Sequence, residues 1–131
     1  MGASVLVLSK ATNRTKTGPR LQKDADALVV EYDYENDDGT IEWSHIVFRD
    51  VLALEYRDIS CCEAGGLVSS TEVRCLSKSD RLSAIVGLWQ ESVGWQEWQQ
   101  KQGGVDRFKH FTLYFDDSCC IDVIAASCQV P

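Results

Sequence analysis

Histidine, proline and methionine are scarce in this chain of 131 residues, which has two, two and one of them. Neither His45 nor His110 belongs to a His-Glu-x-x-His motif, and no Cys-x-x-Cys or Gly-x-Ser-x-Gly motif occurs. No phosphate loop occurs either, because Gly65-Gly66 and Gly103-Gly104 lack a following lysine and a strand-to-helix setting. The chain therefore lacks the signatures of common metalloenzymes, serine hydrolases and nucleotide-binding enzymes. We expect a protein without metal or cofactor, and no motif indicates an enzyme.

Long apolar runs are also absent from the sequence. No run approaches the ~20 residues that a membrane-spanning helix needs, so we expect no membrane association. The apolar start, Met1–Leu8, has no basic region before it and so does not resemble a secretory signal. Internal repeats and low-complexity segments are missing as well. We predict one globular domain over residues 1–131.

The chain has six cysteines, an even number that could form disulfides or a metal site. Two adjacent pairs, Cys61-Cys62 and Cys119-Cys120, lack the two-residue gap of redox and zinc motifs. Neighbouring side chains on a strand point to opposite faces, so such a pair cannot share a metal. Without an export signal, we expect all six to be reduced packing residues in a cytoplasmic protein. The other two are Cys75 and Cys128.

Charge is distributed unevenly along the chain, whose net charge is −7. Residues 1–23 contain five bases and no acid, whereas residues 24–63 contain twelve acids and two bases. An acidic body repels phosphate backbones, which argues against DNA or RNA as a partner. The same field attracts a basic protein.

Hydrophobic periodicity predicts an α+β fold. Alternation predicts strands near 4–9, 27–34, 40–48, 51–57 and 72–76, and a hairpin over 107–128. Asn36-Asp37-Asp38-Gly39 predicts the turn between the second and third of these strands. Ser77-Lys78-Ser79-Asp80 matches a capping box, and the stripe Leu82, Ile85, Val86, Trp89, Val93 follows it. We expect one antiparallel sheet of about six strands, with a main helix at about residues 79–93 packed on one face.

The sequence also gives predictions for one long polar segment, for His110 and for Asp116-Asp117. Residues 10–26 are polar and basic and predict a long loop. His110 shares a strand face with Thr112, which favours a half-buried, hydrogen-bonded histidine over a ligand. Asp116-Asp117 fits turn chemistry better than acid–base or cation chemistry.

An acidic row and two tryptophans form the candidate partner-binding surface. Asp33 and Glu35 lie on one strand face, and Asp37 and Asp38 follow in the turn. Trp95 and Trp98 lie off the helix stripe in a glutamine-rich segment, and exposed aromatic pairs often anchor interfaces. The alternatives are a solvated outer sheet face for the acids and packing over the core edge for the tryptophans.

The end of the chain has the pattern His-aromatic-x-apolar-x-Phe-Asp-Asp followed by Ile-Asp-Val-Ile-Ala. Over residues 107–126 it resembles the closing hairpin of small uncharacterised bacterial proteins, some of them similar to toxin-immunity proteins. The resemblance implies a bacterial protein, of the immunity type in some cases, and assigns no functional residue.

Three functional hypotheses follow from these patterns. The first is a small non-enzymatic interaction module, of the inhibitor or immunity type, that binds a basic protein through Asp33, Glu35, Asp37, Asp38, Trp95 and Trp98. The second is a homo-oligomeric structural protein, in which the basic N-terminal segment of one copy meets the acidic block of another. The third is a small-ligand binder or hydrolase that uses His45 or His110 in a pocket.

Overall fold

The computed structural model describes residues 3–9, 12, 19–24, 27–58, 72–91, 107–115 and 119–130, and these contain nine strands and one helix. The strands are β1 (Ala3–Val7), β2 (Arg20–Asp24), β3 (Ala27–Glu35), β4 (Ile41–Arg49), β5 (Ala53–Asp58), β6 (Glu72–Leu76), β7 (Lys109–Phe115), β8 (Cys119–Ala125) and β9 (Ser127–Gln129), and the helix is α1 (Asp80–Gln90). Among the described residues, no helix has the length and apolarity needed to cross a membrane.

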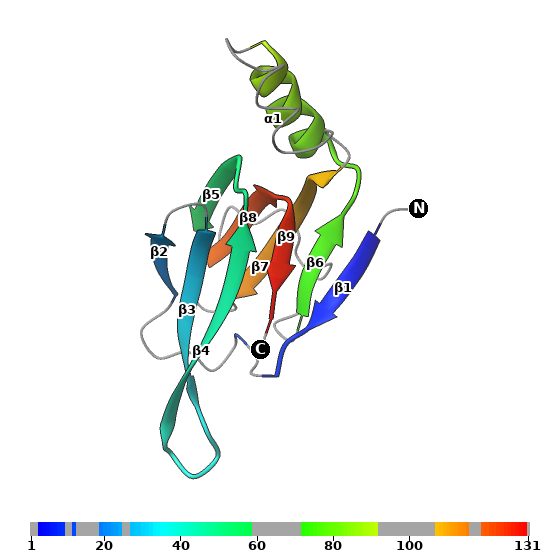
Figure 1. The fold of residues 1–131 in the computed structure, drawn as a ribbon. Coiled ribbons are helices and arrows are strands. Elements are labelled where there is room, and N and C mark those ends of the chain that lie inside the picture. The colour runs from blue at the N-terminus through cyan, green and yellow to red at the C-terminus, as the bar shows by residue number, and fades with distance from the viewer. Residues whose placement is uncertain are drawn as a thin grey trace.

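The strands form two antiparallel sheets that lie face to face (Figure 1). The five-stranded sheet has the order β1-β6-β7-β8-β5, and the four-stranded sheet has the order β2-β3-β4-β9. Each sheet contributes one apolar face to a shared core, which is the usual solution for two sheets that each have one buried side.

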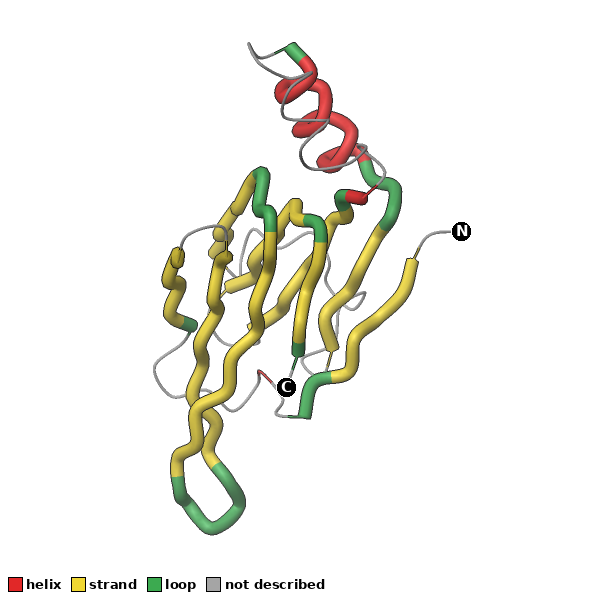
Figure 2. Tube along the Cα trace, viewed as in Figure 1, coloured by secondary structure: helices red, strands yellow, loops and turns green. Residues whose placement is uncertain are grey.

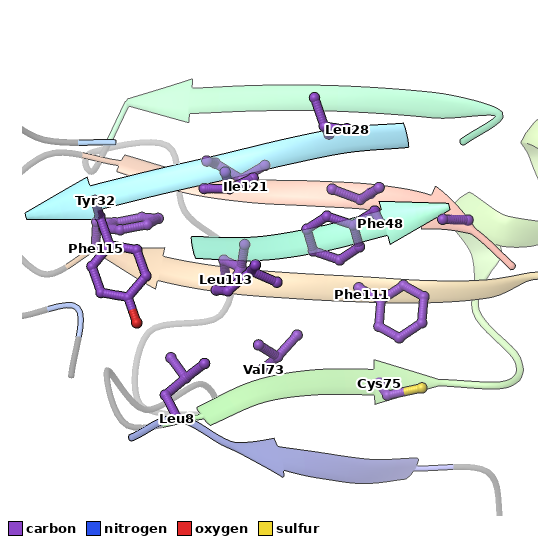
Figure 3. Packing of buried hydrophobic residues seen from close by; sticks show 14 residues of the cluster. Leu8, Leu28, Tyr32, Phe48, Val73, Cys75, Phe111, Leu113, Phe115 and Ile121 are labelled. Atoms are coloured by element: carbon purple, nitrogen blue, oxygen red, sulfur yellow. The ribbon is translucent and has the colours of Figure 1, made fainter. Parts of the chain in front are cut away.

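Side chains from both sheets fill the core (Figure 3). Tyr32 of β3 meets Phe115 of β7 edge to face, with ring centroids 5.7 Å apart. Phe48 of β4 lies 5.5 Å from Phe111 of β7 between ring centroids. Further fully buried members are Val30, Ile46, Val73, Leu113, Ile121 and Val123.

The β3–β4 hairpin follows the predicted turn. Gly39 has φ +85°, a conformation that side-chain-bearing residues rarely adopt, and its N–H donates to the Asn36 carbonyl. The Asp38 carboxylate accepts hydrogen bonds from the N–H and the hydroxyl of Thr40. These bonds lower the pKa of Asp38 and fix the register of the nine paired positions in β3 and β4.

The chain passes between the sheets twice at one corner. It leaves β4 through Asp50, whose φ is +54°, and it enters the five-stranded sheet with the Leu52 N–H bonded to the Ile124 carbonyl. It returns at Ala126, whose N–H donates to the Arg49 carbonyl and starts β9. An ion pair between Arg107 and Asp50 closes the same corner. The two passages therefore hold each other in place.

Helix α1 stands beyond one end of the strands (Figure 2) and packs through its first turns. Leu82 lies in a small apolar cluster with Phe108 and Ile124, and Ile85 and Val86 pack against that cluster. The helix was expected at about residues 79–93, and it begins at Asp80 with Ser79 as its N-cap, whose Oγ accepts from the Leu82 N–H at 3.0 Å. The predicted start is therefore confirmed to within one residue, although Ser77, the first residue of the Ser-x-x-acid pattern, is not the cap.

The prediction of a single sheet of about six strands is wrong. β5 directly follows β4 in the chain, but it pairs with β8 in the other sheet. Alternation identifies the faces of a strand and leaves its neighbour undetermined. β2 lies within the loop predicted at 10–26, and all five of its residues are exposed, so it showed no apolar alternation.

The cysteine prediction is confirmed in part. Cys75 and Cys128 are free, and burial together with the nearby Cys75 thiol raises the pKa of Cys128 to about 12. Cys120, however, is disulfide-bonded, so the prediction of six reduced thiols is wrong. Disulfides persist mainly in oxidising compartments, so this bond does not support the reduced, cytoplasmic setting expected from the sequence.

Candidate functional site

The outer face of the five-stranded sheet carries a row of polar residues. The register pairs Arg74 of β6 with Thr112 of β7, Thr112 with Asp122 of β8, and Asp122 with Glu55 of β5. Because partners in register share a face, these four side chains lie side by side across the sheet. His110 lies on the same face, two residues before Thr112.

A pocket of about 700 Å³ opens over this row, beside the start of α1. Its described lining combines charged, hydroxyl and imidazole groups with a few apolar side chains. The polar members are Arg57, Arg74, Ser79, Asp80, Arg81, His110, Thr112 and Asp122. The volume lies within the range of ~300–1,000 Å³ that is usual for small-molecule sites.

Asp122 is the centre of the polar network and is 3% exposed. Its Oδ1 lies 2.6 Å from His110 Nε2 and accepts a hydrogen bond from Thr112 Oγ1 at 2.9 Å, and its Oδ2 pairs with Arg57. Burial by itself raises the pKa of Asp122, but the bonds from His110, Arg57 and Thr112 outweigh it and lower that pKa to about 2. The carboxylate is therefore ionised at neutral pH.

The charge of Asp122 determines which nitrogen of His110 carries a proton toward it. An ionised carboxylate only accepts hydrogen bonds, so Nε2 carries the proton that Asp122 receives. In the neutral ring Nδ1 is then an acceptor, and it lies 2.9 Å from Ser79 Oγ. In that neutral state the Ser79 hydroxyl donates to Nδ1, while the Ser79 oxygen accepts the Leu82 N–H as the cap of α1.

The three arginines of the pocket differ in their partners. Arg57 pairs with Asp122, and its Nε lies 3.6 Å from Glu55 Oε1. Arg81 pairs with the other oxygen of Glu55. Within the part of the chain that the structure describes, the Arg74 side chain has no hydrogen bond or ion pair. Arg74 is therefore the lining cation whose charge is not neutralised by a described neighbour.

The donor set of the pocket favours an anion. Guanidinium groups bind carboxylate and phosphate oxygens through two parallel N–H bonds. The described residues contain no group of three or more His, Cys, Asp or Glu side chains placed to hold a metal ion.

The structure separates the predicted acidic residues. Asp33 is 2% exposed, so its side chain is not presented to a partner, although it lies on the outer face of its sheet. Glu35 is half-buried, and Asp37 and Asp38 are exposed in the turn. The alternative of a solvated outer sheet face is therefore wrong for Asp33, because alternation identifies the outer face of a strand and does not reveal what covers it.

Several predicted residues lie outside the described residues or apart from the pocket. Trp95, Trp98 and Asp116-Asp117 lie outside the residues that the structure describes. His45 is exposed on β4 and faces outward from the four-stranded sheet, opposite Glu31 in register. His45 and His110 therefore lie on opposite outer faces of the sandwich and do not share a site.

His110 was expected to be half-buried and hydrogen-bonded; its hydrogen bonds are confirmed and it is buried more deeply than expected, but its partners were missed. Ser79 was considered only within a capping motif, and Asp122, Arg57 and Arg74 were not singled out. One available pattern could have found Asp122, because it is a charged residue between Ile121 and Val123 in an otherwise apolar strand. A buried carboxylate needs a partner.

Comparison of the chain with protein-family models, with curated proteins and with solved structures found no match.

Proposed function

We propose that the protein binds a small anionic ligand, carrying a carboxylate or phosphate group, in the pocket beside α1. The observation that carries the proposal is Arg74, which lines the pocket and has no side-chain hydrogen bond or ion pair among the described residues. This proposal corresponds to the small-ligand hypothesis drawn from the sequence, with His110 and not His45 as the histidine of the pocket.

The environment of Arg74 supports an anion in preference to a neutral ligand. Arg57 and Arg81 face the same pocket, and each is held in place by Glu55. Fixed guanidinium groups lose little side-chain entropy when a ligand arrives, so they favour binding more than mobile surface cations do. An anionic ligand would supply the negative charge that no described neighbour provides to Arg74.

The test is a thermal-unfolding titration of the full chain with inorganic phosphate and with citrate, each at constant ionic strength. A ligand that binds only the folded state raises Tm in proportion to its affinity. We expect a concentration-dependent increase for the wild type that disappears in Arg74→Gln. Arg20→Gln is the matched control, because Arg20 is an exposed arginine of the other sheet, over the Trp43 ring. Equal shifts in all three proteins would refute the proposal.

The β3–β4 hairpin supports a second candidate, the binding of a basic protein. Figure 1 shows this hairpin extending past the other strands. Asp37 and Asp38 are exposed at its turn, and Ile41 and Trp43 beside them are 46% and 48% exposed. An acidic tip with apolar neighbours fits the inhibitor-type hypothesis better than the complete set of Asp33, Glu35, Asp37 and Asp38 does.

Charge reversal tests this second candidate. Asp37→Lys/Asp38→Lys should remove a specific basic protein that the wild type retains from extracts of the source organism, identified by mass spectrometry. Glu91→Lys changes an exposed acid at the end of α1 and should retain the partner. Retention of the same partner by all three proteins would contradict a role for the hairpin tip. Homo-oligomerisation and a cytoplasmic location stay predictions of the sequence.

A further inference from the structure

Three side chains of the pocket form a continuous chain of hydrogen bonds. Ser79 Oγ lies 2.9 Å from His110 Nδ1, and His110 Nε2 lies 2.6 Å from Asp122 Oδ1. The three residues come from the start of α1, from β7 and from β8, and all of them line the same pocket. A hydroxyl, an imidazole and a carboxylate in this order are the groups of nucleophilic acyl transfer.

We infer that Ser79 is a nucleophile activated by His110 and Asp122, and that the pocket hydrolyses a carboxylic ester. Asp122 holds the proton on Nε2, so Nδ1 is left as the base that faces the Ser79 hydroxyl. The Ser79 hydroxyl is thus hydrogen-bonded to Nδ1, and the Asp122 carboxylate is hydrogen-bonded to Nε2. Either imidazole nitrogen can act as the base when the other carries a fixed proton.

The helix start supplies a place for the negative charge that forms during attack. The first N–H groups of a helix have no acceptor within it, and they carry partial positive charge. In α1 the Leu82 N–H is used by Ser79, which leaves the Asp80 and Arg81 N–H groups without an intrahelical acceptor. These two groups directly follow the nucleophile in the chain, where they can stabilise an oxyanion.

Helix capping alone does not account for the network. A cap needs only the Ser79 oxygen, and Leu82 already packs on Phe108 and Ile124. Burying His110 and Asp122 costs desolvation energy that well-packed apolar residues would avoid. The sheet thus carries a costly polar cluster at a position where docking of the helix does not require it.

The reaction balances without any further reagent. The Ser79 Oγ forms a bond to the ester carbonyl carbon while its proton passes to His110 Nδ1. The bond from carbonyl carbon to alcohol oxygen breaks, and Nδ1 returns the proton to the departing alcohol. Water then attacks the acyl-serine with His110 as base, which releases the acid and restores Ser79. If the proposed anion binding is right, Arg74 selects esters that also carry a carboxylate or phosphate.

The test is covalent labelling of the full chain with a small alkyl fluorophosphonate, followed by peptide mass spectrometry. Attack by Ser79 forms an Oγ–P bond and releases fluoride, so the label remains on one peptide. We expect Ser79 to be labelled, and His110→Gln to lower the labelling rate by ~10²–10⁴-fold. Ser79→Asn should abolish the label while it keeps the cap, because asparagine is as good a cap as serine. Ser83→Ala removes an exposed serine of the same helix and should leave labelling unchanged.

The positioning role of Asp122 has a separate spectroscopic readout. Nitrogen NMR shifts in His45→Gln, which leaves one histidine, should show the proton of His110 on Nε2. In Asp122→Asn the preference for Nε2 should be lost and the labelling rate should fall.

Two outcomes would overturn the inference: a folded wild type that takes no label, or Asp122→Asn and His110→Gln variants that are labelled as fast as the wild type. Anion-dependent stabilisation without labelling would reject the esterase and keep the binding proposal. Labelling of Ser79 without anion-dependent stabilisation would support the esterase inference and reject the anion-binding proposal.

Discussion

The two faces of the central strands β7 and β8 differ in composition although the same backbone carries them. The inner face presents Phe111, Leu113, Phe115, Ile121 and Val123 to the other sheet, and all five are at most 3% exposed. The outer face presents His110, Thr112 and Asp122, which are 8%, 6% and 3% exposed. Both faces are buried, but one is held by packing and the other by hydrogen bonds and an ion pair.

This difference indicates which face is optimised for stability. Apolar burial contributes ~25 cal/mol per Å² without any demand on partner geometry. A buried carboxylate contributes only when each of its partners is in place. The contribution of the outer face therefore depends on a specific hydrogen-bonded network, whereas that of the inner face depends on apolar packing, and departures from apolar packing are common at functional sites.

The largest expected effect comes from the inner face. Phe115→Ala should lower the free energy of unfolding by about 3–5 kcal/mol, because it leaves a cavity beside Tyr32 and removes the edge-to-face ring contact. Urea unfolding followed by fluorescence measures this change. Val7→Ala is the control, since Val7 is 70% exposed, and it should change stability by less than about 0.5 kcal/mol. Similar losses in both variants would contradict the assigned core.

A two-part substitution tests the outer face. Asp122→Ala leaves Arg57 and His110 without their buried partner and should cost about 3 kcal/mol. The double variant Arg57→Met/Asp122→Leu should recover most of that loss, because it removes both charges and retains volume. Both values come from the same urea experiment. A double variant less stable than Asp122→Ala would show that the outer face is needed for stability itself.

Acid should weaken the outer face before the inner face. The folded-state pKa of Asp122, about 2, is below its ordinary value of 3.8, so its contribution is complete above pH ~4 and is lost as the pH falls toward 2. Unfolding free energies measured between pH 5 and pH 2 should therefore decline more steeply in the wild type than in Asp122→Asn. Parallel curves would mean that Asp122 is not stabilised in its ionised form.

The smallest expected effect separates the two tasks of Ser79. Ser79→Ala removes the cap of α1 and should cost about 1 kcal/mol, whereas Ser79→Asn should cost a few tenths. Helix content by circular dichroism and urea unfolding measure both variants. Equal losses would show that the hydrogen bond to His110, and not the cap, is the main contribution of Ser79 to stability.

The sequence predicted the elements whose determinants are local. The β3–β4 turn follows from Gly39 and Asp38, and α1 follows from a serine cap before an apolar stripe. The closing β7–β8 hairpin follows from alternation on both strands.

What the sequence could not predict depends on contacts distant in the chain. The partition into two sheets depends on the corner at Arg49 and Ala126, which no local pattern encodes. β2 escaped notice because an exposed edge strand needs no apolar face. The pocket was missed because Ser79, His110 and Asp122 belong to three elements, and their meeting depends on the sheet order.

The sheet order also sets the sequence of folding events. β3 and β4 are joined by a short turn and can pair within microseconds, whereas β5 (53–58) can pair only after β8 (119–125) reaches it. β1 depends in the same way on β6 (72–76). Closing such long loops is entropically costly, so the five-stranded sheet beyond its β7–β8 hairpin should assemble late and slowly. Until it does, the apolar side of the β3–β4 hairpin lies open to water, and this interval is when the chain is most prone to aggregate.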